Sequence, residues 1–204
     1  MATTTNYGWT TPDDTSLVKD GAAAIRTLGS SIDTSLNTAL GTRKAGMVLL
    51  NTTSFSAVAS QSVNDVFSAT YDRYIIQFNA TKSTSSNIQL RFRVSGADNT
   101  TTNYGYQFIR GTGTSVTGNA VNASSFVLNV DDTQNQADTL NVFSPFLTEH
   151  TMIQDQSITG VGGSSAQLVV TGGRLGLTTS FTGFSLIASA GTITGSVSVF
   201  GVNK

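Results

Sequence analysis

The stretch NIQLRFRVS, residues 87–95, carries the pattern on which the fold prediction depends. Apolar and polar residues alternate along it, which is the two-residue period of a strand with one buried face. We therefore expect Leu90 and Phe92 to face a core, and Arg91 and Arg93 to face solvent.

Further segments have the same β-rich composition and are separated by clusters of Gly, Asn, Asp and Ser. They are MVLLNT (47–52), RYIIQFNA (73–80), YGYQFIR (104–110), SFVLNV (125–130), LNVFSPF (140–146), AQLVVTG (166–172), FSLIAS (184–189) and TITGSVSVFGV (192–202). No helical period lies between them. Residues 45–204 are therefore predicted to form a mainly β domain, an antiparallel β-sandwich of the jelly-roll-like type.

The residues before this domain have a helical period instead. Pro12 followed by Asp13 and Asp14 is typical of a helix N-terminus, because proline fits the first turn and carboxylates favour the positive end of the helix dipole. The sequence predicts an extended lead over residues 1–13 and a helix over residues 14–44.

The predicted helix has one apolar stripe and two weak points. The stripe consists of Val18, Ile25, Leu28, Ile32 and Leu36. Gly21 and Gly29 each cost about 1 kcal/mol relative to alanine, so an isolated helix of this length is marginal in water. The stripe needs a partner, either the following domain of the same chain or the same helix of other copies. We favour the second, an oligomerisation stalk, although the spacing alone does not distinguish a dimer from a trimer.

The composition excludes several classes of function. Charged residues make up 11% of the 204 residues, against about 25% in an average soluble domain. A formal net charge of -1 gives no basic field for nucleic acid or an anionic membrane, so neither is an expected partner. The absence of cysteine excludes disulfides, thiolate catalysis and cysteine-ligated zinc. The start, MATTTNYGWTTPDD, lacks the basic and apolar regions of a signal peptide.

Few residues offer catalytic or metal-binding chemistry. His150 is the only histidine, and no GxSxG motif accompanies it. Asp131, Asp132 and Asp138 share one oxygen-rich segment, which could bind calcium but lacks the glycine and terminal glutamate of an EF-hand. A solvated loop is the favoured interpretation. Paired carboxylates for glycoside cleavage are conceivable through Asp131, Asp132 or Asp155, but such enzymes usually need a longer groove. We expect no enzyme, no cofactor and no metal.

Sugar binding is an alternative, because Trp9 and several tyrosines could stack on a sugar ring. These tyrosines are Tyr71, Tyr74, Tyr104 and Tyr106. A place in the core or on a strand face is commoner for such side chains, and we favour it.

The segment NYGWTTPDDTSLVKDGAAAIRTLGSSID, residues 6–33, resembles a segment near the start of tail-fibre and other minor structural proteins of tailed bacteriophages. NDVFSATYDRYIIQF (64–78) and GTITGSVSVFGVNK (191–204) resemble strands of the β domains of virion appendages. In such proteins the amino-terminal segment docks on the particle and the β domain projects outward.

The resemblance implies a virion component, a homotrimeric short fibre or appendage that meets other virion proteins through its N-terminus, with a host surface glycan as a candidate partner. It assigns virion docking to Tyr7, Trp9, Pro12 and Asp13, and the trimer core to the apolar stripe. Fibres of this type usually have much longer shafts, which favours a short fibre or neck appendage here. A capsid decoration or cement protein and a non-catalytic carbohydrate-binding module are the alternatives.

Overall fold

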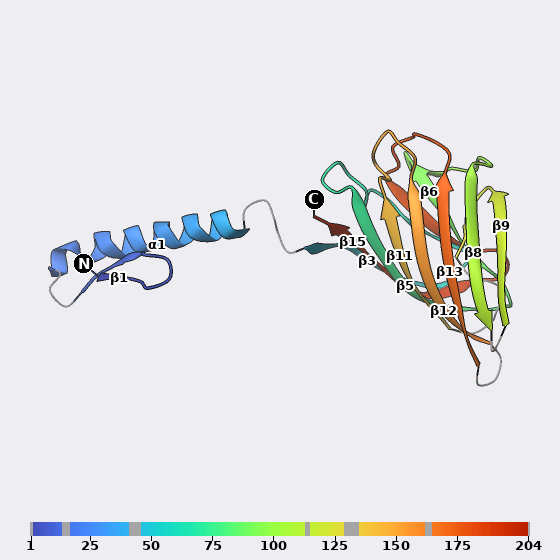
Figure 1. Cartoon of the computed structure of the whole chain (residues 1–204), viewed down its shortest axis with the longest axis horizontal. Helices are drawn as coiled ribbons and strands as arrows, with labels where there is room; N and C mark the ends of the chain where they lie inside the picture. The colour runs from blue at the N-terminus through green and yellow to red at the C-terminus, as the bar shows by residue number, and fades with distance from the viewer. Residues whose placement is uncertain are drawn as a thin grey trace. The chain divides into compact units, whose positions relative to one another are not determined.

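The computed structural model describes residues 2–13, 17–40, 46–112, 115–128, 135–161 and 165–203. The chain divides into two compact units, Met1–Ala45 and Gly46–Lys204 (Figure 1). We call them the helical unit and the β unit. The described residues are mainly β, with antiparallel sheets and a single helix.

The helical unit begins with a short hairpin. Strands β1 (Ala2–Thr3) and β2 (Thr10–Thr11) pair antiparallel. In the turn between them, the N–H of Thr4 donates to the Trp9 carbonyl oxygen at 2.9 Å, and the N–H of Gly8 donates to the Thr4 carbonyl oxygen at 2.9 Å. Gly8 adopts a φ of 65°, a conformation that favours glycine. The lead, predicted to be extended, therefore closes on itself.

The helix α1 spans Val18–Leu40 and has 23 residues. It is shorter than the predicted range of 14–44, whose residues 14–16 and 41–44 lie outside the described part of the chain. Pro12 and Asp13, predicted to mark the helix start, precede the helix, and Asp20 is the acidic residue of its first turn.

The β unit contains two antiparallel sheets (Figure 1). The larger has eight strands in the order β3-β15-β5-β11-β12-β13-β8-β9. Their bounds are β3 (Met47–Val58), β15 (Ile193–Val202), β5 (Arg73–Lys82), β11 (Gln136–Phe143), β12 (Met152–Val161), β13 (Ser165–Leu175), β8 (Tyr104–Thr112) and β9 (Ser115–Ala123).

The smaller sheet has five strands. They are β10 (Phe126–Val127), β6 (Ile88–Val94), β14 (Gly183–Ala188) and β4 (Ser60–Val63), in that order, with β7 (Ala97–Asp98) pairing to β6. The chain passes between the two sheets repeatedly, so most neighbouring strands within a sheet are distant in sequence.

One hydrophobic core joins the inner faces of the two sheets. Phe126 of the smaller sheet packs edge-on against Tyr104 and Tyr106 of the larger sheet, with ring centroids 4.9 and 6.1 Å apart. Leu90 and Phe92 are fully buried in this core, which confirms their predicted direction.

Arg91 and Arg93 lie on the opposite face of β6 but are half-buried rather than free in solvent. Arg93 forms an ion pair with Asp98 and donates to Ser185 Oγ at 2.9 Å, and the Nε of Arg91 donates to the Ser124 carbonyl oxygen at 3.0 Å. These bonds fix the outer face of the smaller sheet.

Each predicted β segment overlaps an observed strand, although residues 129–130 of the 125–130 segment lie outside the described residues. In the β unit the sequence did not predict β4, β7, β9 or β12. Of these, β12 matters most for the site, because it lies in the middle of the larger sheet.

Candidate functional site

One face of α1 supports the amino-terminal hairpin. On this face Ala24 is buried and three further residues are half-buried, at the three- and four-residue spacing of one side of a helix. These three are Leu28, Ser31 and Ser35. Ser35 Oγ accepts a hydrogen bond of 2.9 Å from the indole N–H of Trp9. This bond places the hairpin over that face and accounts for its burial.

A second, adjacent face of α1 is apolar and uncovered within the helical unit. Val18 is 97% exposed, Ile25 64% and Leu36 52%. Their separations of seven and eleven residues place them on one side of the helix. We call these three residues the exposed stripe.

The predicted stripe thus differs in exposure among its members. Leu28 and Ile32 are half-buried, whereas Val18, Ile25 and Leu36 are exposed, and Ile32 lies between the exposed stripe and the hairpin-facing side of the helix. Sequence periodicity did not separate them because the hairpin that covers one face was not predicted.

The four candidate docking residues also differ in exposure. Tyr7 is 69% exposed, and its ring stacks on Trp9 with the centroids 5.0 Å apart and the planes at 16°. Pro12 is exposed, while Trp9 and Asp13 are half-buried. Tyr7 and Pro12 are therefore the accessible members, and Trp9 contributes to the structure of the unit.

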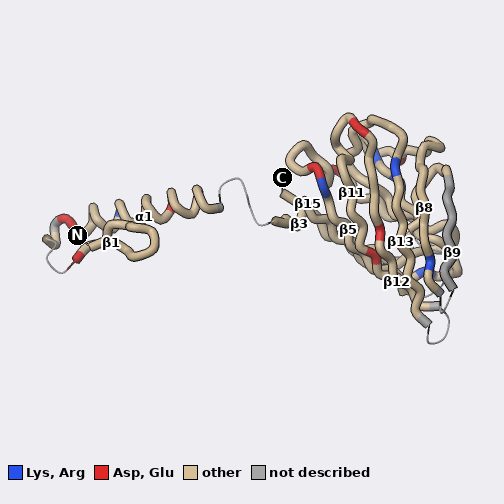
Figure 2. Tube along the Cα trace, in the orientation of Figure 1, with Lys and Arg blue, Asp and Glu red and all other residues tan. Residues whose placement is uncertain are grey.

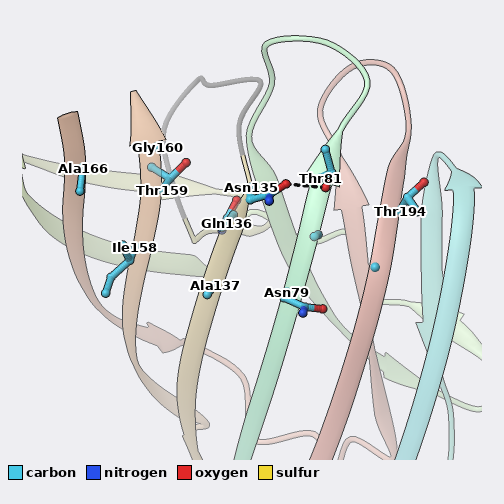
Figure 3. A pocket seen from close by; sticks show the side chains of 12 residues that line it. Asn79, Thr81, Asn135, Gln136, Ala137, Ile158, Thr159, Gly160, Ala166 and Thr194 are labelled. Atoms are coloured by element: carbon cyan, nitrogen blue, oxygen red, sulfur yellow. Dashed lines mark hydrogen bonds between the residues drawn. The ribbon is translucent and has the colours of Figure 1, made fainter. Parts of the chain in front are cut away.

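The outer face of the larger sheet carries a shallow groove of about 700 Å³ (Figure 3). Its lining comes from β5, β11, β12, β13 and β15 and includes Asn79, Thr81, Asn135, Ile158 and Thr194. The hydroxyl of Thr81 donates to Asn135 Oδ1 at 2.7 Å, as the dashed line marks. Among the described residues that line this groove none is charged or aromatic, so they offer hydrogen bonds without an acid, a base or a stacking surface.

The inner face of the same sheet contains a buried polar cluster on β11, β12 and β13. It consists of Asp138, Asp155, Ser157 and Thr171, which we call the interior cluster. Asp138 is 4% exposed, and the other three are fully buried. Asp138 was predicted to lie in a solvated loop, which is wrong: it lies on β11 and points inward. Asp131 and Asp132 lie outside the described residues.

Burial controls the protonation of the two carboxyl groups. It raises the pKa of Asp138 to about 8, with Gln136, Ser157 and the charge of Lys82 lowering that pKa in part. Burial and then the charge of Asp138 raise the pKa of Asp155 well above its ordinary value. Neither carboxylate has a hydrogen bond of normal geometry to its oxygens, although Ser157 and Gln136 lie close to Asp138.

The tyrosines considered for sugar stacking belong mainly to the core. Tyr74 and Tyr104 are fully buried, Tyr106 is 7% exposed and Tyr71 is half-buried. They cannot form an open stacking surface in this structure. His150 is exposed, between β11 and β12.

The described residues lack a metal-binding group and a membrane-spanning helix. They contain no group of three or more His, Cys, Asp or Glu residues placed to hold a metal ion. None of their helices combines the length and apolar character needed to cross a membrane.

Comparison with known proteins finds no matching family model, no matching curated protein and no matching solved structure.

Proposed function

We propose that this chain is a structural component of a phage particle, a short homotrimeric fibre or appendage. Its amino-terminal unit would anchor it to other virion proteins, and its β unit, a jelly-roll-like sandwich, would project outward. The resemblance of residues 6–33 to phage appendage proteins supplies the virion location and the threefold symmetry.

The observation that carries the proposal is the exposed stripe of Val18, Ile25 and Leu36. Three large apolar side chains, each more than half exposed, are costly on one face of a helix in water. The helix also contains Gly21 and Gly29, which weaken it further. Packing the stripe against the same helix of other copies in a parallel bundle would bury these side chains and would also stabilise each helix.

The sparse charge is consistent with dense assembly. Figure 2 shows few charged residues along the trace, and the formal net charge is -1. Copies packed side by side therefore experience little mutual repulsion. The groove on the outer face of the larger sheet is the candidate contact for a host glycan, through hydrogen bonds rather than aromatic stacking.

The test is the mass of the full-length chain by sedimentation velocity and light scattering. We expect a trimer that dissociates in the double variant Ile25→Asp, Leu36→Asp, because two buried carboxylates per helix would oppose bundling. Thr34→Asp is the matched control, since residue 34 lies nine positions, about 180°, from residue 25 on the helix. A monomeric wild-type chain, or a mass unaffected by the double variant, contradicts the proposal.

A further inference from the structure

The interior cluster is assembled by strand register. Asp138 of β11 lies directly opposite Ser157 of β12, and Asp155 of β12 lies directly opposite Thr171 of β13. Side chains alternate between faces along each strand, so all four residues point to the same inner face. Residues in directly opposite or diagonal positions are close enough for their side chains to interact.

By distance and angle the side-chain oxygens of this cluster make no regular hydrogen bond, although Gln136 and Ser157 beside Asp138, and the Gln156 N–H beside Asp155, lie close enough to lower the pKa values of the two carboxyl groups in part. Both carboxylate oxygens of Asp138 and of Asp155, the Ser157 Oγ and the Thr171 Oγ1 are buried and unpaired. Buried polar atoms in folded proteins are almost always paired with protein, water or an ion, because an unpaired one costs about 1–3 kcal/mol. Such a concentration of unpaired oxygens on one patch indicates a ligand that accepts their lone pairs.

The described basic side chains near the cluster do not balance the charge of both carboxylates. Lys82 is the described base whose charge acts on Asp138, and its Nζ donates to Gln136 Oε1 at 3.5 Å. Arg110 of β8 is half-buried and lies opposite Val169, on the far side of β13 from Ser157. One lysine balances at most one of the two carboxylates when both are ionised.

We propose that the interior cluster binds one hard divalent cation of the calcium type inside the β unit. The two carboxylates offer four oxygens and the Ser157 and Thr171 hydroxyls two more, which reaches the lower end of the six to eight oxygens that Ca²⁺ takes. The ligands come from three adjacent strands, so the cation ties the centre of the larger sheet together. This site is independent of the helical stripe and of the proposed assembly.

The direct test uses the full-length wild-type chain, freed of metal with a chelator and titrated with MnCl₂ or CaCl₂ at pH 8. Electron paramagnetic resonance of Mn²⁺ and calorimetry with Ca²⁺ should report one saturable site per chain. A concentration of 100 times Kd should raise the melting temperature by about 5–10 °C. Absence of saturable binding at millimolar cation overturns the proposal.

Variants locate the site. Asp155→Asn and Asp138→Asn should each weaken binding at least tenfold, because each replaces an anionic ligand by a neutral amide. Ser157→Ala is a milder variant that should weaken binding without altering charge. Glu149→Gln, the same chemical change at an exposed residue of the β unit, should bind like the wild type. Wild-type affinity in both aspartate variants would overturn the assignment to this cluster.

A pH series gives a second readout. Protons and the cation compete for the same carboxylates, so the cation-induced rise in melting temperature should be larger at pH 8 than at pH 5.5. A rise that is equal at the two pH values would contradict binding at Asp138 and Asp155.

Discussion

The indole N–H of Trp9 donates a hydrogen bond of 2.9 Å to the hydroxyl of Ser35, which lies 26 residues further along the chain. This bond joins the amino-terminal hairpin to the C-terminal half of α1. Trp9 is the only tryptophan in the chain, so its fluorescence reports directly on whether the hairpin is docked on the helix.

Ser35→Ala should loosen this docking. The variant removes the acceptor of the indole N–H, and a single partly exposed hydrogen bond is worth about 0.5–1.5 kcal/mol. We expect the fluorescence emission of Trp9 to shift to longer wavelength. We also expect a lower urea midpoint when unfolding is followed by the fluorescence of Trp9. Ser30→Ala, an exposed serine on the same helix, should leave both values unchanged. An unaltered emission maximum in Ser35→Ala would show that the hairpin docks without this bond.

Tyr104→Phe should destabilise the β unit more than an average surface change. The Tyr104 hydroxyl accepts from the Phe92 N–H at 3.1 Å and donates to the Asn99 carbonyl oxygen at 3.0 Å. Its removal leaves a buried N–H unpaired, at a cost of about 1–3 kcal/mol. Burial also raises the pKa of Tyr104 to about 12, so the hydroxyl remains a donor at every ordinary pH.

The measurement for Tyr104→Phe is urea unfolding followed by circular dichroism of the β signal. Tyr106→Phe is the matched control, because Tyr106 packs on the same Phe126 ring. Equal midpoints for the two variants would show that the Tyr104 hydrogen bonds contribute nothing beyond burial.

The strands that could be predicted from sequence are those with apolar residues directed inward. In β6 the inward positions Leu90 and Phe92 are apolar, and the pattern identified the strand correctly. In β12 the inward positions include Asp155, Ser157 and Thr159, while Ile158 faces outward and is 57% exposed. The usual relation between hydrophobicity and burial is reversed there, so the sequence pattern did not predict a strand with a buried face.

The same reversal hid the interior cluster. Asp138 and Asp155 are 17 positions apart in the sequence and become neighbours only through the register of β11 with β12. A polar residue at every second position, as in Asp155, Ser157 and Thr159, is the available signal. It gains meaning only once the strand is known to be central in a sheet.

Gly195→Ala should destabilise the β unit by about 2 kcal/mol or more, because overpacking against backbone cannot be relieved by a side-chain movement. A Cβ at residue 195 would overlap the Asn79 carbonyl oxygen and lie 2.9 Å from the Ala80 Cα. Gly195 also lies at a register shift between β15 and β3, where the backbone is irregular. The measurement is the thermal unfolding midpoint of the β unit in the full chain.

Gly172→Ala is the control for this prediction. Gly172 also lies inside a strand, but no atom lies within 4 Å of its added Cβ. Alanine there should be neutral or stabilising by up to about 1 kcal/mol, since it reduces the entropy of the unfolded chain. Comparable losses in the two variants would contradict the steric argument.

Asp138→Asn should stabilise the metal-free β unit at neutral and alkaline pH. The pKa of Asp138 is raised from 3.8 to about 8 because burial disfavours its charged form. The native state therefore binds a proton that the unfolded chain releases, so this contribution to stability is complete below pH 3.8 and is lost as pH rises toward 8. The pKa of Asp155 is raised as well, so its ionisation also lowers the stability of the native state as pH rises.

The comparison is made in chelator, with the free energy of unfolding measured from pH 5 to pH 9. The wild type should lose stability across this range, and Asp138→Asn should lose less and exceed the wild type by a few kcal/mol at pH 8, because the amide has no proton to release. Glu149→Gln should follow the wild-type curve, since that side chain is exposed. Parallel curves for Asp138→Asn and the wild type would mean that Asp138 titrates alike in the native and unfolded states, and that its burial does not control its charge.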